Sequence, residues 1–324
     1  MGNRGVGERP LRRGDVVALR SPREILETLD DAGSLDGLVF MPEMLGYFGR
    51  RFTVSTRVER ACDTINYSGA RRMPATVMLD DLRCDGGGHG GCQAGCRIYW
   101  KEAWLRRAGD SGSTELADDH SIDQLRAIAM KNSQREDVGG GSEVYRCQAT
   151  DFLNASQRLG WWSVRSFFRE VTTGNVTPWR FARVMSRLVV DEVGRRLRIV
   201  QSKPFKHAGG VNTREKPLGL NPGSRVRVRS AEEIAQTLDE GSRLRGLWFD
   251  REMVPYCGTS ATVKARVERF VDETSGKMVE LKSDCLILDG VTCKGYISDG
   301  RWFCCRGIYP WWREAWLEPE DQQG

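Results

Sequence analysis

The stretch GDVVALRSPREILETLD, which spans residues 14–30, indicates how the whole chain is organised. A second stretch, GSRVRVRSAEEIAQTLD, spans residues 223–239 and matches the first at an offset of 209 residues. The same offset relates, without a gap, Gly37 to Gly246, Phe40 to Phe249, Glu43 to Glu252, Met44 to Met253, Tyr47 to Tyr256 and Cys84 to Cys293. Each copy is about 95 residues long, which is the size of a small domain and not of a solenoid unit.

Each copy begins with a strand followed by a capped helix. The segments VVAL (16–19) and VRVR (225–228) have strand composition. A serine follows each strand and a glutamate stands three places further on, which is the pattern of a capping box: Ser21 with Glu24, and Ser230 with Glu233. We expect these short helices to end near Gly33 and Gly241.

The rest of each copy predicts short strands. Residues 50–60 and 260–270 alternate in polarity, and residues 76–84 and 285–293 are strand-like up to an aspartate turn. The opening GDVVALR and the closing EAWL are similar to the SH3-like barrel of nitrile hydratase β subunits, a resemblance that implies only a fold. The tryptophan-rich ends could stack on bases or sugars, but closing the core of a small barrel is their more common role.

Residues 108–216 separate the two copies, and their sequence pattern differs from that of the β-rich copies. Polar and glycine-rich stretches at 109–121 and 138–143 predict linkers. Helical segments are predicted from Ser121, Ala149, Trp161 and Thr177. The expected fold is mainly β with α insertions: SH3-like, cysteine-rich repeats at residues 11–107 and 217–319 flank a small helical domain at residues 108–216.

Composition narrows the classes of function. The 324 residues carry a formal net charge of only +5, which is low for a dedicated nucleic-acid binder. The chain has neither an apolar run long enough to span a membrane nor a secretory signal, so we expect no membrane association and a cytoplasmic protein. In a reducing compartment, the ten cysteines are expected to be metal ligands and not disulfides.

The first copy suggests a metal site within CDGGGHGGCQAGC (84–96). Its candidate ligands come from two segments: Cys62, Cys84, Cys92, Cys96 and, as a substitute, His89. Four thiolates suit a tetrahedral Zn²⁺ or an iron–sulfur cluster, and glycines allow the backbone to pass close to an ion. Alternatively, the thiols could be small buried hydrophobes, and His89 could be an exposed loop residue.

The second copy shares only part of this ligand set. Val271 and Ile308 stand where the first copy has Cys62 and Cys96. A different set of four cysteines is available there: Cys257, Cys285, Cys293 and Cys304. Cys147, between the copies, is most simply a single buried or half-buried thiol.

The motifs FMPEM, CDGGGHGGCQAGC and IYWKEAWL, followed by REMVPYCG and IYPWWREAWL, resemble an uncharacterised family of bacterial cysteine-rich proteins. The resemblance implies no known reaction, and it implies an accessory or tailoring role in a biosynthetic pathway. This chain departs from the pattern at Phe48, where a cysteine is expected, and at Arg301, where a histidine is expected.

Three functions remain open. The first is a zinc–thiolate protein that acts as an accessory or interaction component, with a pathway enzyme or another protein as its partner. The second is a metalloenzyme in which Cys84, Cys92, Cys96 and His89 hold iron, copper or zinc with an open coordination position. The third is nucleic-acid binding through an arginine stripe on the last central helix: Arg180, Arg183 and Arg187.

Overall fold

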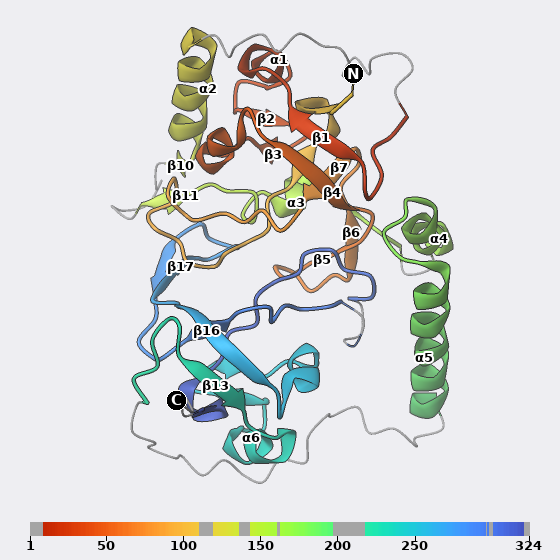
Figure 1. Ribbon diagram of the computed structural model, residues 1–324, viewed down its shortest axis with the longest axis vertical. Helices are drawn as coiled ribbons and strands as arrows, with labels where there is room; N and C mark the ends of the chain where they lie inside the picture. The colour runs from red at the N-terminus through yellow and green to blue at the C-terminus, as the bar shows by residue number, and fades with distance from the viewer. Residues whose placement is uncertain are drawn as a thin grey trace. The chain divides into compact units, whose positions relative to one another are not determined.

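The computed structural model describes residues 9–109, 119–135, 143–160, 163–196, 218–295, 297 and 301–320. Most of the two predicted polar linkers lies outside these residues. The structure is a mixed α/β fold with several antiparallel sheets (Figure 1). The chain divides into two compact units, and the segments that each contains are not contiguous in sequence. Unit 1 contains Met1–Thr177, Arg269–Val279 and Phe303–Arg306, and unit 2 contains Pro178–Glu268, Glu280–Trp302 and Gly307–Gly324.

Unit 1 contains a five-stranded antiparallel sheet in the order β8-β7-β4-β1-β9. Its strands are β1 (Val16–Leu19), β4 (Arg51–Arg57), β7 (Thr76–Leu79), β8 (Trp100–Lys101) and β9 (Leu105–Arg107). Val17 is buried and its neighbour Val16 is exposed, because successive strand residues face opposite sides of a sheet. Strand β4 pairs with β7 through a bulge between Val54 and Thr56.

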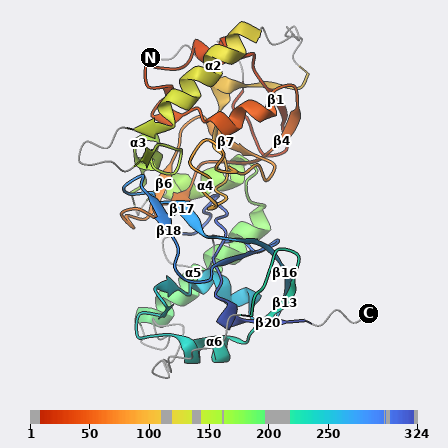
Figure 2. The same ribbon diagram turned by 90° about the vertical axis from the view of Figure 1, so that its left-hand side faces the viewer.

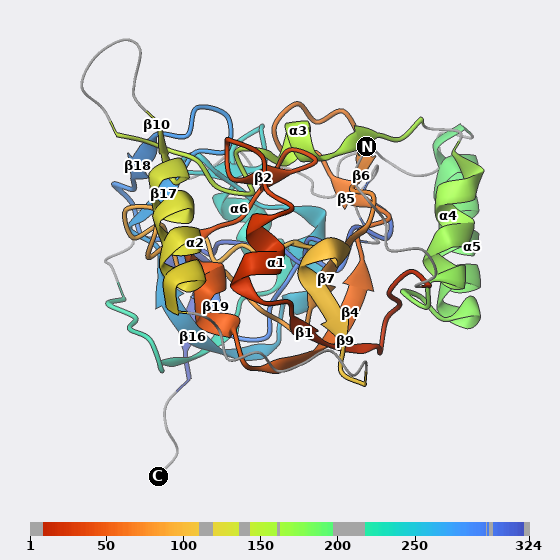
Figure 3. The same ribbon diagram turned by 90° about the horizontal axis from the view of Figure 1, so that it is seen from above.

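Short helices connect the strands of unit 1: α1 (Pro22–Leu26), the 3-10 helices η1 (Pro42–Tyr47) and η2 (Glu102–Trp104), α2 (Asp119–Asn132), α3 (Phe152–Ala155) and α4 (Val164–Thr172). The capping box at Ser21 is confirmed, with both reciprocal hydrogen bonds to Glu24. Helix α1 ends at Leu26 and not near Gly33, because the chain continues as turns and forms a tight contact with α2 at Gly33. Helices α1 and α2 lie side by side (Figure 3).

Four smaller sheets complete unit 1. They are β5 (Ala61–Cys62) with β6 (Ala70–Arg72) and β12 (Gln157–Arg158), β2 (Ser34–Leu35) with β3 (Leu38–Val39), β10 (Gln134–Arg135) with β11 (Val144–Tyr145), and β17 (Arg269–Val271) with β18 (Met278–Glu280). The β17–β18 hairpin comes from late in the chain but lies within unit 1 (Figure 2), where the Tyr145 N–H donates to the Gly276 carbonyl at 2.8 Å.

Unit 2 contains a four-stranded antiparallel sheet in the order β19-β16-β13-β20. Its elements are α5 (Pro178–Arg196), β13 (Arg225–Val228), α6 (Ala231–Thr237), β14 (Arg243–Leu244), β15 (Leu247–Trp248), η3 (Arg251–Tyr256), β16 (Ser260–Arg266), β19 (Leu286–Leu288), η4 (Glu314–Trp316) and β20 (Leu317–Pro319). The capping box at Ser230 is confirmed. Helix α6 ends at Thr237, before the expected Gly241, because the extended Leu238 turns into the core.

The strand pairs of the two larger sheets lie at positions that the 209-residue offset relates. Val17 pairs with Phe52, and Val226 pairs with Ala261. Trp100 and Trp104 in the first copy, and Trp312 and Trp316 in the second, are buried in the cores, as expected. The Trp104 indole N–H donates to Thr28 Oγ1 at 3.0 Å, and the Trp316 indole N–H donates to Thr237 Oγ1 at the same distance.

The middle segment is only partly helical. The helices predicted from Ser121, Trp161 and Thr177 are present as α2, α4 and α5. The helix predicted from Ala149 is wrong over most of its length, because only Phe152–Ala155 is helical and Gln157–Arg158 forms β12. Ser156 is extended, and its carbonyl accepts from the Arg71 guanidinium at 2.7 Å, so the chain leaves the helix to pair with β6.

Candidate metal centre

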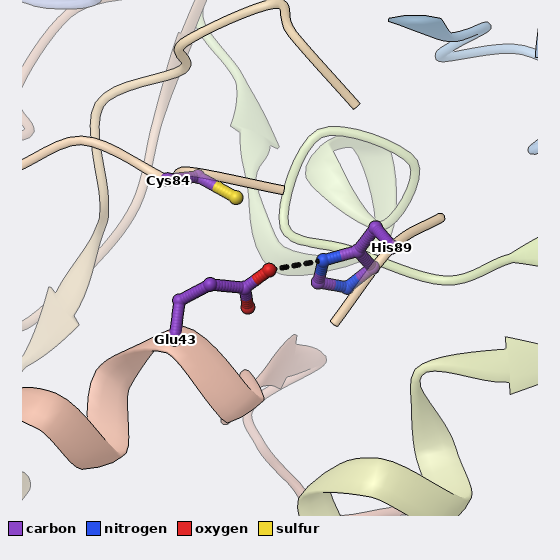
Figure 4. A group of neighbouring side chains, drawn as sticks. All are labelled: Glu43, Cys84 and His89. Atoms are coloured by element: carbon purple, nitrogen blue, oxygen red, sulfur yellow. Dashed lines mark hydrogen bonds and ion pairs between the residues drawn. The ribbon is translucent and has the colours of Figure 1, made fainter. Parts of the chain in front are cut away.

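Three potential metal ligands come together in unit 1. Glu43 lies on η1, Cys84 follows the turn after β7, and His89 lies in the glycine-rich loop of residues 85–95. One ligand atom from each side chain lies within 4.8 Å of the other two (Figure 4). The site is well shielded from solvent, because the side chains of His89 and Glu43 are only 1% and 4% exposed.

Both ring nitrogens of His89 have hydrogen-bond partners. Nδ1 lies 2.7 Å from Glu43 Oε1, and Nε2 lies 3.0 Å from the backbone carbonyl oxygen of Arg146. A carbonyl only accepts hydrogen bonds, so Nε2 carries a hydrogen and donates it. Metal-binding histidines commonly donate their second ring N–H to a carbonyl in this way, which fixes the orientation of the ring. Nδ1 faces the Glu43 carboxylate, which also only accepts hydrogen bonds, so a metal ion that binds Nδ1 displaces the hydrogen that lies between these two atoms.

Glu43 has one satisfied and one unsatisfied oxygen. Oε1 accepts from the Gly88 N–H at 3.0 Å as well as contacting His89. Oε2 is buried and has no hydrogen-bond partner in the described part of the chain. An unpaired buried carboxylate oxygen is costly, typically about 1–3 kcal/mol, so a cation at this position would remove a real penalty.

The surroundings shift the pKa values of the Glu43 carboxyl and the Cys84 thiol in opposite directions. Burial pushes the pKa of Glu43 upward, but the hydrogen bond and charge of His89 and the hydrogen bonds from backbone N–H groups, including that of Gly88, together hold the pKa below its usual value. Burial, and then the charge of Glu43, raise the pKa of the Cys84 thiol far above its ordinary value. The pair is therefore a carboxylate next to a neutral thiol, and a bound cation would favour the thiolate.

This geometry argues against Cys84 as a catalytic nucleophile. In a cysteine–histidine–carboxylate triad, one ring nitrogen faces the thiol and the other faces the carboxylate. Here the nitrogen that does not face Glu43 is bonded to the Arg146 carbonyl. A reactive cysteine also needs a lowered pKa, whereas the pKa of Cys84 is raised. A metal site fits these three side chains better than a nucleophilic one.

The loop that carries His89 is packed so closely that glycine is required at two positions. Gly86 has φ +76°, and a Cβ there would lie 2.0 Å from the Cys92 carbonyl oxygen. Gly90 has φ +60°, and its Cβ would lie 2.4 Å from the Tyr145 hydroxyl. Because both positions combine a left-handed backbone with a steric barrier, the loop can place His89 over Glu43 only with glycine there.

The structure places the ligands predicted for the first copy in two different locations. Cys84 and His89 belong to the triad, and Cys92 and Cys96 lie in and at the end of the same loop. Cys62 lies instead next to Cys304, whose sulfur accepts from the Cys62 backbone N–H at 3.1 Å. The four-thiol set of the first copy stays a prediction. Sequence reasoning missed Glu43, although its match with Glu252 at the repeat offset marked the position.

The ligands predicted for the second copy belong to both units. Cys257, Cys285 and Cys293 lie in unit 2, whereas Cys304 lies in unit 1. Burial raises the pKa of Cys257 to about 11 and that of Cys285 to about 12. Within the described part of unit 2, no three potential ligand groups lie within 4.8 Å of one another. This set also stays a prediction.

Glu252, the counterpart of Glu43, has a different set of partners. Its carboxylate accepts from the backbone N–H groups of Lys294 and Gly295 at 3.2 Å and of Ile297 at 2.8 Å. The glutamate therefore anchors the loop that follows the shared cysteine in both units. In unit 1, a histidine and an unpaired oxygen stand at this anchor, which makes it the candidate site.

Comparisons with protein-family models, with curated proteins and with solved structures find no match to this chain. None of the described helices is long and apolar enough to cross a membrane. All ten cysteines are free thiols.

Proposed function

We propose that this protein binds a transition-metal ion, with zinc as the first candidate, at Glu43, Cys84 and His89. The observation that carries the proposal is the meeting of three different ligand types within 4.8 Å, with one buried carboxylate oxygen left unpaired. Carboxylate oxygen, imidazole nitrogen and thiolate sulfur are all ligands that Zn²⁺ accepts in proteins. The Arg146 carbonyl supports the proposal, because it orients the ring and leaves Nδ1 for the ion.

The role that we propose for the ion is structural. It joins η1 to Cys84 and the glycine-rich loop that follows Cys84 directly, a segment that is distant from η1 in sequence. The free energy of metal binding would add directly to the stability of this part of unit 1, because the unfolded chain lacks the assembled site. This role suits an accessory or interaction component that presents a folded surface to a pathway enzyme or another protein.

The same proposal includes an SH3-like barrel for each repeat. It is supported by the sequence similarity of the opening and closing segments and by strand pairs that the repeat offset relates. A ligand that joins loops to a small β-domain would supplement a core of limited size.

A metalloenzyme is the competing reading, because three protein ligands leave one coordination position for water or a substrate. The near-complete burial of His89 and Glu43 favours the structural role. Cobalt substitution separates the two readings. A structural site keeps one absorption spectrum when candidate small molecules are added, whereas an open site changes its spectrum as its coordination changes.

Nucleic-acid binding is a second candidate function that one observation favours. Arg180, Arg183 and Arg187 on α5 are exposed, and the Arg183 guanidinium lies 5.8 Å from the ring centre of Trp179, which is 72% exposed. An exposed aromatic ring next to arginines can stack on a base while the guanidinium groups contact phosphates. Binding of single-stranded RNA that weakens steeply with salt would support this function, and no binding at low salt would exclude it.

Elemental analysis tests the main proposal. We expect protein purified without added metal to contain zinc, and we expect His89→Ala to lose the ion bound at the triad. His120→Ala is the matched control, because His120 is an exposed histidine on α2 and should leave the metal content unchanged. Equal metal content in wild type, His89→Ala and His120→Ala would reject the site.

A further inference from the structure

Two hydrogen bonds within unit 1 join a loop of the first copy to a hairpin of the second copy. The Val271 N–H donates to Cys92 Sγ at 3.3 Å. The Gln93 N–H donates to the Arg269 carbonyl at 3.1 Å. The second-copy residues of both bonds lie on β17, and the first-copy residues lie in the glycine-rich loop of residues 85–95. A strand of the second copy therefore holds the loop that carries His89.

The same two bonds occur again in unit 1 with the roles of the copies exchanged. The Cys62 N–H donates to Cys304 Sγ at 3.1 Å. The Cys305 N–H donates to the Arg60 carbonyl at 3.0 Å. Here the hairpin is β5–β6 of the first copy, and the segment that it holds is Phe303–Arg306, which comes from the second copy and belongs to unit 1.

The repeat relates these two pairs of bonds position by position. The offset of 209 residues relates Arg60 to Arg269 and Cys62 to Val271. After Cys84 the second copy is three residues longer, so later positions match at an offset of 212, which relates Trp100 to Trp312, Cys92 to Cys304 and Gln93 to Cys305. Each copy therefore binds a segment of the other with the same hairpin, which is the reciprocity of a symmetric dimer interface. A contact that occurs twice at equivalent positions is a built feature of the protein.

The loop that β17 holds is the one that carries the candidate metal centre. Among the described residues, the only group of three potential ligands within 4.8 Å is Glu43, Cys84 and His89. The Cys92 N–H donates to the His89 carbonyl at 3.1 Å. The contact of β17 with Cys92 therefore acts directly on the turn that positions His89.

The β17–β18 hairpin also holds the group that orients the His89 ring. In the turn between the two strands, the Gly276 carbonyl accepts from the Tyr145 N–H at 2.8 Å. The next residue is Arg146, whose carbonyl oxygen lies 3.0 Å from His89 Nε2. One hairpin thus contacts both the backbone that carries the histidine and the segment that fixes the direction of its ring.

We infer that the β17–β18 hairpin of the second copy is a positioning element for the metal centre of the first copy, and that zinc binding and hairpin docking stabilise each other. The inference rests on the proposed function, because the coupled ligand is the zinc ion at the triad. Groups that orient metal ligands without touching the metal commonly change the affinity for the ion by about 10–100-fold. Coupling between two binding events is reciprocal, so the same factor describes the effect of zinc on hairpin docking.

Gly276→Ala tests the positioning role without changing a metal ligand. Gly276 has φ +73°, and a Cβ there would lie 2.6 Å from the Tyr145 carbonyl oxygen. Gly258→Ala is the matched control, because Gly258 has φ +74° and nothing lies within 4 Å of its Cβ. Competition with a chromophoric chelator measures the affinity for the zinc ion that His89→Ala loses. We expect this affinity to be weaker by about 10-fold or more in Gly276→Ala and unchanged in Gly258→Ala.

Hydrogen–deuterium exchange of the wild type tests the reciprocal effect and covers the case in which Gly276→Ala does not fold. The two peptides to compare span residues 269–279 and residues 60–72, which are the two equivalent hairpins. The second hairpin is the internal control, because the segment that it holds carries no group of three ligands among the described residues. Zinc should slow the exchange of residues 269–279 by about 10-fold more than that of residues 60–72.

The outcomes separate the inference from the proposed function. If His89→Ala binds zinc as the wild type does, the proposed function fails and the inference fails with it. If His89→Ala loses the ion but Gly276→Ala keeps the wild-type affinity, the hairpin has no positioning role and only the triad survives. Equal slowing of exchange in both hairpins would also overturn the inference, because zinc would then stabilise unit 1 only as a whole.

Discussion

Glu170 on α4 provides a sharp test of the electrostatics of unit 1. Its side chain is buried, with the residue only 2% exposed, and Oε2 accepts from the Asn175 side-chain amide at 2.8 Å. Oε1 has no hydrogen-bond partner among the residues that the structure describes. Burial raises the pKa of Glu170 to about 8, and the Asn175 hydrogen bond and the charge of Arg60 only partly oppose this effect. The folded protein therefore holds a proton on Glu170 that the unfolded chain releases near pH 4.5.

The sign of the pH dependence follows from this difference. Between pH 4.5 and about 8, the folded state binds one more proton than the unfolded state, so the free energy of unfolding falls as pH rises. The slope is about 1.4 kcal/mol per pH unit, and from pH 5.5 to pH 8 the loss from this one group is about 3 kcal/mol. Glu170→Gln mimics the protonated side chain and removes this loss.

Urea unfolding of wild type and Glu170→Gln at pH 5.5 and pH 8 measures the effect. The quantity to compare is the difference in unfolding free energy between the two proteins, because contributions of other groups cancel. We expect this difference to shift by about 3 kcal/mol in favour of the variant as pH rises. A difference that does not change with pH would show that Glu170 is ionised in the folded protein, which would refute the reasoning.

Three further predictions follow from local geometry. Gly86→Ala should reduce both stability and zinc content, because its Cβ would meet the Cys92 carbonyl oxygen. Gly69→Ala is the control: its φ is also positive but open space surrounds it, so this variant should keep its zinc. Elemental analysis and thermal unfolding compare the two variants. Ser21→Ala should lower the free energy of unfolding by about 1 kcal/mol through loss of the α1 cap, and an unchanged urea midpoint would contradict this. Thr28→Val should lower the free energy of unfolding by about 1–3 kcal/mol, because the buried Trp104 indole N–H loses its acceptor. Thr53→Val is the control, since no side-chain hydrogen bond joins the Thr53 hydroxyl to a tryptophan among the described residues.

Local signals in the sequence predicted local structure well. Ser21 and Ser230 are N-caps because a hydroxyl and a glutamate three residues later satisfy the first backbone N–H groups, a pattern that depends on neighbouring residues only. The ends of the same helices were less predictable. Leu238 leaves the helix because its side chain is needed in the core, and that demand comes from residues distant in sequence.

The candidate site combines one predicted and one missed feature. The spacing within residues 84–96 indicated metal ligands, and the structure places Cys84 and His89 in a possible metal-binding group. Glu43 was missed because it lies on a separate 3-10 helix, and no local spacing connects it to the loop. Only the repeat offset, which pairs Glu43 with Glu252, marked the position where both copies anchor their loops.

The grouping of thiols was also beyond sequence reasoning. The repeat offset assigned Cys304 to the second copy, but the segment Phe303–Arg306 lies in unit 1, where the Arg306 guanidinium donates to Glu273 at 2.7 Å and to the Cys62 carbonyl at 3.2 Å. A repeat aligns positions along the chain and says nothing about which unit a segment joins. Cys147 has no counterpart in either copy, so its position against the core of unit 1 became visible only in the structure.

Crystals of zinc-loaded protein, measured at the zinc absorption edge, would test the central claim most directly. We expect an anomalous difference peak within bonding distance of a Glu43 carboxylate oxygen, Cys84 Sγ and His89 Nδ1. Zinc-loaded crystals without a peak at these three atoms would contradict the claim.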